Sequence, residues 1–314
     1  MTTEPTGIIA INEGSEVVHH NSTWTKIVGR PEYLIHMALL NALGSEGPIV
    51  VPEISDTKET GNPEHTMQIE MAHLPGIPYP RDTWNHFGAY LDKKTCRFVV
   101  VALREFNGVR VSLDLGLHLL DETPSLTIRL LHGYPDHLNK VVSQSNVIEI
   151  MSAIEDTISS LRPCLVHGDM IPNNFSVVDG RLNLIDFSTL GMARPGFDEG
   201  RLWAHSLFAP QGVQQVILDT FSEQYGNNPG YLLYFWKTAF LRTARAIVML
   251  KKGRYDKDLN LAVNSFAENP HTIMIMSNLQ GRGLTLRGYL EERLRTQMDY
   301  AFKMLKTTFL KQEL

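Results

Sequence analysis

Cysteine is scarce in this chain of 314 residues, which contains only Cys96 and Cys164. Two cysteines that lie so far apart in the sequence are too few for a disulfide framework or for a tetrahedral zinc site. A reducing, cytoplasmic compartment is the simplest expectation from this low cysteine content.

Long apolar segments are missing as well. The longest apolar stretch without Asp, Glu, Lys or Arg spans residues 202–218, and Pro210 and several glutamines interrupt it. Lipid hydrocarbon does not tolerate such polar groups. Residues 1–5 contain Glu4 and no basic residue, unlike the start of a secretory signal. The sequence therefore predicts neither a membrane partner nor export.

No sign of charge dominates: 29 Lys and Arg residues stand against 34 Asp and Glu residues, for a net charge of −5. Because the two signs are interleaved, the sequence predicts no surface that would follow nucleic-acid phosphates. The hydrophobic content of 43% is that of a globular protein, and the length allows two lobes with a sizeable core.

The first part of the chain alternates short β-like runs with turn residues, which predicts one small sheet. The expected strands are residues 7–11, 16–19, 24–28, 49–51 and 66–71. A single helical pattern interrupts them, with Pro31 at its start and Gly44 as its stop. Proline and glycine then gather in residues 74–80, where we place the boundary between a lobe of residues 1–74 and a lobe of residues 75–314, with a hinge at about 70–80.

The second part is dominated by helical patterns. Helices are expected over residues 82–106, with Asp82 as N-cap and a break at Gly88, over 146–161, and through most of the chain after Asp198, ending with 284–310. Short strands are expected at residues 165–166, 175–178 and 182–185. The last two are joined by Asp179-Gly180, a strong hairpin signal.

A polar loop between the first of these strands and the hairpin carries the chemistry. It holds His167, Asp169 and Asn174, and the second hairpin strand leads to Asp186. Carboxylate and amide oxygens suit Mg²⁺, so Asn174 and Asp186 are the candidate metal ligands. Asp169 is then available to accept or orient the proton of a hydroxyl group. Phosphoryl transfer needs little more from a protein than this positioning and charge neutralisation.

The spacing His167-Gly-Asp-x-x-x-x-Asn174, followed by Ile185-Asp-Phe187, resembles the catalytic loop and metal motif of the aminoglycoside phosphotransferase and choline kinase-like family. That family shares the protein-kinase fold. The resemblance implies an α+β, two-lobed structure with a small β-sheet lobe, a larger and mainly helical lobe, and a site between them. It also implies ATP or GTP and Mg²⁺ as cofactors, with Asp169 and Asn174 as catalytic residues.

The same resemblance assigns roles outside the catalytic loop. Lys26, on the third expected strand, corresponds to the lysine that contacts the α- and β-phosphates. Glu32 is the only acid in the following helix and corresponds to the glutamate paired with that lysine. Backbone groups near Glu70 to Ala72 correspond to the adenine-binding hinge. Asp198 corresponds to the structural aspartate that caps a helix of the large lobe.

Departures from protein kinases favour a small-molecule acceptor. Gly168 replaces the arginine that usually follows the loop histidine, Ile171 replaces the lysine two residues after the catalytic aspartate, and Ser188 replaces the glycine of the metal motif. The nucleotide loop at residues 12–15 contains one glycine, where phosphate-cradling loops usually contain several.

Simpler interpretations stand beside these assignments. Asp169 and Asn174 also suit ordinary turns, and His167 suits a structural donor better than a base. Lys26 could be an exposed strand lysine, and Glu32 a favourable acid in a first helical turn.

Three further features have two interpretations. Cys164 is better explained as buried filler than as a nucleophile. The aromatic run at residues 231–236 favours core packing over an acceptor pocket. Several acids could meet a cationic antibiotic, although solvated helix faces explain them better. These acids are Asp198, Glu199, Glu291 and Glu292.

The sequence therefore predicts a kinase that moves the γ-phosphoryl group of ATP or GTP to a hydroxyl of a small molecule. An aminoglycoside-like or other hydroxylated antibiotic is the first expectation for the acceptor. A metabolic kinase of the choline, sugar or nucleoside type and a nucleotide-binding pseudoenzyme are the alternatives. Residues 107–145 and the helices after Asp198 are expected to select the acceptor. A homodimer is compatible with the sequence, and nothing in the sequence requires one.

Overall fold

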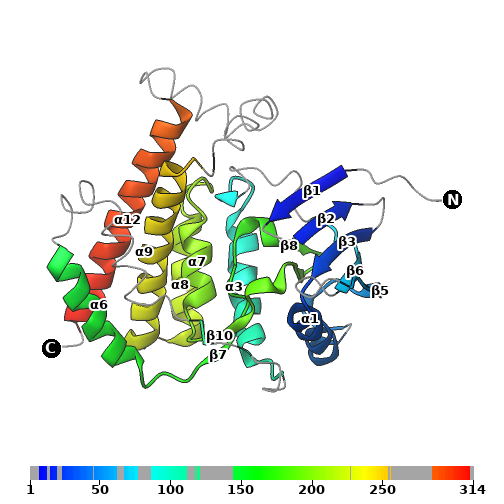
Figure 1. The fold of residues 1–314 in the computed structure, drawn as a ribbon. Helices are drawn as coiled ribbons and strands as arrows, with labels where there is room; N and C mark the ends of the chain where they lie inside the picture. Colours follow the sequence, from blue (N-terminus) through cyan, green and yellow to red (C-terminus); the bar gives the residue numbers. More distant parts are fainter. Residues whose placement is uncertain are drawn as a thin grey trace.

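The computed structural model shows a small half built on a sheet beside a larger half built mainly of helices (Figure 1). The structure describes residues 7–12, 15–19, 23–44, 46–61, 67–76, 86–111, 117, 119–120, 144–226, 228–253, 255 and 285–311. The predicted α+β, two-lobed architecture is confirmed. The described residues do not include Asp82, residues 13–14 of the expected nucleotide loop, much of the segment 107–145 or residues 256–284.

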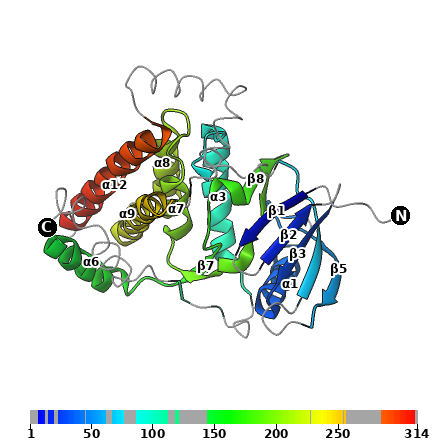
Figure 2. The same ribbon diagram turned by 45° about the horizontal axis from the view of Figure 1, so that its top comes forward.

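The small half is an antiparallel sheet of five strands in the order β1-β2-β3-β6-β5. Its strands are β1 (Gly7–Asn12), β2 (Ser15–His19), β3 (Thr23–Val28), β5 (Ile54–Glu59) and β6 (Met67–Ala72). Helix α1 (Arg30–Leu43) lies against this sheet in both ribbon views (Figures 1 and 2). As predicted, Pro31 lies in its first turn and Gly44 ends it with a φ of 65°.

One predicted strand of this sheet is wrong. β4 (Ile49–Val50) pairs in parallel with β9 (Arg181–Leu184) of the large half, and β5 takes the expected place in the small sheet. The physical reason is burial. β4 belongs to a short apolar run and Ile49 is buried, whereas β5 is an edge strand whose side chains are almost all exposed and polar.

The predicted hairpin is confirmed. β8 (Phe175–Val178) pairs with β9, and Val178 lies opposite Arg181 across a two-residue turn. Both turn residues have positive φ, 51° for Asp179 and 70° for Gly180, which is the conformation that matches the twist of a tight hairpin. β7 (Cys164–Val166) pairs with β10 (Gly191–Ala193) and leads into the polar loop.

The helices of the large half run side by side (Figures 1 and 2). They are α3 (Lys93–Gly108), α6 (Gln144–Ile158), α7 (Phe197–Ala204), α8 (Val213–Tyr225), α9 (Pro229–Lys251) and α12 (Leu286–Leu310). α3 begins later than expected because Asp92 caps it, accepting a bond from the Thr95 N–H at 2.7 Å. The predicted break at Gly88 is confirmed by a turn in which its φ is 80°.

The core of the large half surrounds α9. The aromatic run contributes Tyr234, Phe235 and Trp236, each at most 1% exposed, so the core-packing interpretation is confirmed. Trp236 meets Trp203 edge-on at 5.2 Å between ring centroids. Gly200 of α7 is small by necessity, since a Cβ there would lie 2.5 Å from the carbonyl oxygen of Phe235. Helix α7 is therefore pressed directly against the backbone of α9.

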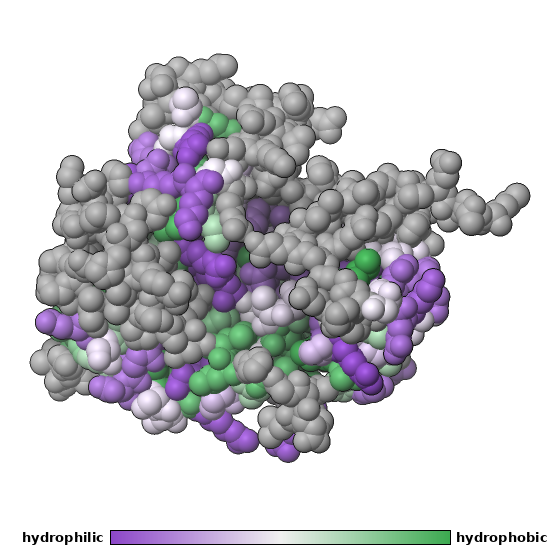
Figure 3. Space-filling view, in the orientation of Figure 1, coloured by the Kyte–Doolittle hydropathy of each residue, from purple (hydrophilic) through white to green (hydrophobic). Residues whose placement is uncertain are grey.

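The segment that joins the halves is attached to the hairpin. The carbonyl oxygen of Pro75 accepts bonds from Ser176 Oγ at 2.6 Å and from Asn183 Nδ2 at 3.0 Å. Gly76, with a φ of 75°, follows in close contact with Val178. Along the described residues, no helix has both the length and the apolar character needed to cross a membrane. Hydrophobic side chains gather over β7 and β10 on the face shown in Figure 3.

Candidate active site

Asp198 holds the polar loop in place. Its carboxylate is fully buried and accepts bonds from the N–H of His167 at 2.7 Å and of Gly168 at 3.0 Å. The expectation that Asp198 caps a helix is wrong, because its oxygens are used on the loop. Glu199 supplies the cap of α7 instead, by accepting from the Gly196 N–H at 3.1 Å. Burial raises the pKa of both carboxyl groups, that of Glu199 to about 7.

Gly168 occupies a position that no other residue fits. Its φ is +83°, and a Cβ there would lie 1.9 Å from the carbonyl oxygen of Thr189. This contact between the loop and the segment after the metal motif explains why the arginine typical of protein kinases is replaced by glycine.

The His167 ring makes two hydrogen bonds that hold the loop. Its Nδ1 accepts from the N–H of Asp169 at 3.3 Å, so its Nε2 donates to the carbonyl oxygen of Ile185 at 2.9 Å. The ring is fully buried and tilted against Phe187, which also meets His36 of α1 edge-on. These contacts favour the structural role over a role as base, and they connect α1 to the catalytic loop.

Asp169 and Asn174 lie side by side at the end of the loop. Asn174 Nδ2 donates to Asp169 Oδ2 at 3.1 Å and to the Asp169 carbonyl oxygen at 2.9 Å. Asn174 is buried, whereas the side chain of Asp169 is 32% exposed. Tyr90 supports the loop by donating to the carbonyl oxygen of Pro172. The loop thus presents one accessible carboxylate whose second oxygen is fixed.

Asp186 connects the two halves. Its Oδ1 lies 3.1 Å from Lys26 Nζ on β3, and Lys26 Nζ lies 2.6 Å from Glu32 Oε1 on α1. Burial lowers the pKa of Lys26, but the Asp186 and Glu32 carboxylates outweigh it and the net direction is upward, so the ammonium persists at neutral pH. Asp186 itself has a φ of +66°, a strained backbone held by the Ser188 hydroxyl bond at 2.9 Å and the turn that follows.

The donor set fits a hard divalent cation. Because the amino group of Asn174 is used on Asp169, its Oδ1 is the atom that can ligate a cation. The Ile185 N–H donates to the Asn174 carbonyl oxygen at 3.0 Å, which makes Asn174 and Asp186 neighbours across the hairpin. Among the residues that the structure describes, no group of three or more His, Cys, Asp or Glu side chains could hold a metal. Two protein oxygens completed by phosphates and water are typical of Mg²⁺ in nucleotide sites.

Glu70 and Ala72 lie on β6 of the small half. Glu70 pairs across to Thr25 on one side and Asp56 on the other. The N–H of Ala72 donates to the Glu53 carbonyl oxygen at 2.8 Å, so this donor already serves the small half.

The family model of the phosphotransferase enzyme family APH matches residues 31–234, which include the loop, the hairpin and Asp186. The chain belongs to the phosphotransferase enzyme family. A search among curated proteins found no match to the sequence.

Solved structures similar to this phosphotransferase family member share its fold at low identity. The GDP and kanamycin complex of APH(2")-IIIa is 10% identical with a TM-score of 0.53, over 84% of this chain and 94% of that one. Spectinomycin phosphotransferase APH(9)-Ia with ADP and spectinomycin is 13% identical with a TM-score of 0.53, over 93% and 92%. A choline/ethanolamine kinase family protein from Mesorhizobium loti is 14% identical with a TM-score of 0.54, over 95% and 94%. The fold is therefore protein-kinase-like.

Two arginines of this family member were missed by the sequence reasoning. Arg201 Nη1 of α7 lies 3.5 Å from Asp169 Oδ1, and Arg242 Nη2 of α9 lies 3.6 Å from the same oxygen. Both side chains are about nine-tenths buried. An isolated arginine on a helix is usually solvated, so no pattern in the sequence distinguishes these two from the others.

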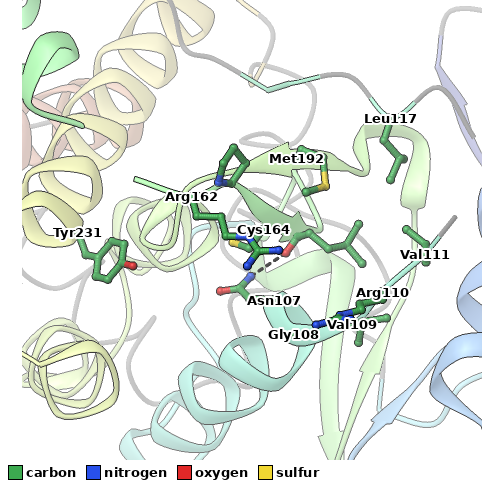
Figure 4. A pocket seen from close by; sticks show the side chains of 12 residues that line it. Asn107, Gly108, Val109, Arg110, Val111, Leu117, Arg162, Cys164, Met192 and Tyr231 are labelled. Atoms are coloured by element: carbon green, nitrogen blue, oxygen red, sulfur yellow. Dashed lines mark hydrogen bonds between the residues drawn. The ribbon is translucent and has the colours of Figure 1, made fainter. Parts of the chain in front are cut away.

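A cavity of about 580 Å³ lies apart from this site (Figure 4). It is bordered by the end of α3, the start of β7, β10 and Tyr231 of α9, and Arg110 and Arg162 lie at its margin. None of Lys26, Asp169 or Asp186 lines it. Cys164 lines this cavity and is half-buried, so it is not the fully buried filler that was expected. Desolvation raises the pKa of its thiol, which disfavours a role as nucleophile.

Proposed function

We propose that this protein transfers the γ-phosphoryl group of ATP or GTP to a hydroxyl group of a small molecule. Two sets of contacts carry the proposal: one runs from Glu32 through Lys26 to Asp186, and the other joins Asn174 to Asp169. The backbone bond from Ile185 to Asn174 brings the two sets together. In this proposal, these residues bind the phosphates, ligate the metal and accept the proton at the junction of the two halves.

Each group has one task in the transfer. Lys26, held by Glu32, contacts the phosphates, and Asn174 Oδ1 and Asp186 would hold Mg²⁺, which neutralises phosphate charge when bound. Asp169 orients the acceptor hydroxyl and takes its proton. A bond forms between the acceptor oxygen and the γ-phosphorus, the bond from that phosphorus to the bridging oxygen breaks, and its electron pair leaves with the nucleoside diphosphate.

The nucleotide base is placed after β6 in this proposal. Because the Ala72 N–H is already used, recognition of the base falls to backbone groups beyond Ala72, at the hinge between lobes of residues 1–74 and 75–314. Two of the three named neighbours contain both a nucleotide, GDP or ADP, and an antibiotic. Their contents support a nucleotide site and a small-molecule acceptor in this proposal. Their sequence identity to this chain is too low to indicate which acceptor this protein uses.

The test is Mg²⁺-dependent transfer from labelled ATP and GTP to a panel of aminoglycosides, other hydroxylated antibiotics, nucleosides, sugars and choline. We expect Asp169→Asn to lower kcat at least about 100-fold while nucleotide affinity stays close to that of the wild type. Asp156→Asn, a change of another aspartate on α6, is the matched control and should leave kcat unchanged. Normal turnover by Asp169→Asn would contradict the mechanism.

A further inference from the structure

We propose that the acceptor carries an anionic group, a carboxylate or a phosphate, close to the hydroxyl that is phosphorylated, and that Arg242 and Arg201 recognise it. This inference rests on the proposed function and names the class of its acceptor. It also departs from the first expectation, a cationic aminoglycoside.

The two oxygens of Asp169 face different parts of the molecule. Oδ2 accepts from Asn174, which belongs to the metal side, and Oδ1 faces the two arginines. The acceptor must approach the carboxylate from the side away from the metal and nucleotide, because attack on the γ-phosphorus is in line. The arginines therefore lie on the acceptor side, next to the position of the reacting hydroxyl.

Arg201 and Arg242 both form ion pairs with Asp169 at distances beyond those of direct hydrogen bonds. At 3.5 and 3.6 Å, both contacts to Asp169 are longer than direct hydrogen bonds of 2.7–3.2 Å, although they are close enough for electrostatic attraction. Two guanidinium groups that converge on one point can bind a carboxylate or phosphate through several charge-assisted bonds. A cation placed beside them would be repelled.

Among the described residues, three acids that were considered for a cationic acceptor are engaged elsewhere. Asp198 and Glu199 are buried and accept bonds from backbone N–H groups. Glu291 is paired with Arg295 and lies 3.9 Å from Lys251. Three of the four acids considered for an aminoglycoside therefore have structural partners.

The two arginines differ in how they are attached to the loop. Arg201 Nη1 also donates to the Gly168 carbonyl oxygen, and its guanidinium lies 4.3 Å above the Phe197 ring, so Arg201 is tied to the loop itself. Arg242 comes from the middle of α9 and meets the loop at the side chain of Asp169. Arg242 is consequently the better residue to change without disturbing the loop.

The experiment compares acceptors that differ only in charge. Glycerol, ribose and glucose are each tested beside their carboxylate and phosphate derivatives, with kanamycin and choline as cationic acceptors. We expect an anionic member to exceed its neutral parent about 100-fold in kcat/KM, and the carboxylate and phosphate arms identify which anion is preferred. A neutral or cationic compound as the best acceptor would overturn the proposal.

The variants separate recognition from positioning. Arg242→Gln should raise KM for the anionic acceptor about 10-fold or more, with kcat within about threefold and an unchanged KM for MgATP. Arg242→Lys should recover part of the loss, since it keeps the charge without the planar fork. Arg162→Gln, at the exposed margin of the separate cavity, is the control. An equal fall of kcat for charged and neutral acceptors would show that Arg242 only positions Asp169.

A binding measurement keeps the two proposals distinguishable. MgATP affinity is measured first, and its absence would count against the proposed function. Sodium glycerate and glycerol are then titrated into the MgADP complex. Glycerate binding that Arg242→Gln abolishes supports the anion site even if no compound in the panel is phosphorylated, whereas absent or unchanged binding overturns it.

Discussion

Lys26 illustrates how single residues acquire their roles from distant partners. It lies 160 residues before Asp186 in the sequence, and yet the two side chains meet at 3.1 Å. The same holds for Asp198, whose carboxylate fixes a loop 30 residues earlier. The residue types at these positions suit phosphoryl transfer, and burial strengthens their electrostatic interactions because the surroundings screen them less than water does.

At the residue scale, the raised pKa of Glu199 predicts how the stability of the fold depends on pH. Its pKa rises from the ordinary value of 4.5 to about 7 because of burial and the neighbouring Asp198. Between these values the folded state holds a proton that the unfolded state has lost, so the free energy of unfolding falls as pH rises from about 4.5 to 7. Glu199→Gln should flatten this fall in a series of thermal melts.

Glu223→Gln changes an exposed acid on α8 and is the control, with an expected slope equal to that of the wild type. An unchanged slope in Glu199→Gln would show that this carboxyl group does not titrate in that range.

At the scale of helices and strands, three elements fix the polar loop in place. β7, the hairpin and α7 each anchor the loop at one point. The loop begins at the end of β7, the Ile185 carbonyl oxygen accepts a hydrogen bond from the His167 ring, and the Asp198 carboxylate accepts hydrogen bonds from two backbone N–H groups. α7 in turn is pressed on α9 at Gly200. The loop is thus held in part by a strand, the hairpin and α7, which lie outside it.

At this scale, Gly168→Ala should distort the loop. The new methyl group would overlap the Thr189 carbonyl oxygen in a backbone conformation that alanine adopts with strain. We expect a loss of about 2–4 kcal/mol in stability and a large fall in kcat.

Gly108→Ala is the matched control for Gly168→Ala, because a Cβ at Gly108 would meet nothing within 4 Å. Chemical denaturation and steady-state kinetics of both variants check the prediction. Equal behaviour of the two variants would contradict the close contact.

Several contacts among the described residues join the two halves of the molecule. They include the ion pair of Lys26 with Asp186, the parallel pairing of β4 with β9, and the bonds from Ser176 and Asn183 to Pro75 of the connecting segment. A nucleotide bound at this junction would contact both halves. Its binding energy would therefore oppose their separation.

For the whole molecule, we expect MgADP to stabilise the fold by about 2.7 kcal/mol at 100 times its Kd, and EDTA to remove most of this gain. Lys26→Met should reduce the gain, because it removes the cation for the phosphates and leaves the partly buried carboxylates of Glu32 and Asp186 without it.

Lys58→Met, an exposed lysine on β5, should keep the full gain from MgADP. Thermal melts with and without MgADP provide the comparison. A full gain in Lys26→Met would place the nucleotide elsewhere.

The sequence by itself determined the local features of this protein. The Asp179-Gly180 turn, the hairpin and the ends of α1 followed from turn chemistry and capping, which act over a few residues. The two-lobed class followed from the resemblance of the polar loop to that of a known family. The catalytic loop was recognised because its residues are close together in the chain.

Only the tertiary structure decided the features that depend on distant pairing. These are the pairing of β4 with β9, the use of Asp198 on the loop, and the approach of Arg201 and Arg242 to Asp169. Strand partners and buried ion pairs are chosen by which surfaces pack together, and a one-dimensional pattern does not contain that choice. The acceptor class proposed here depends on those contacts.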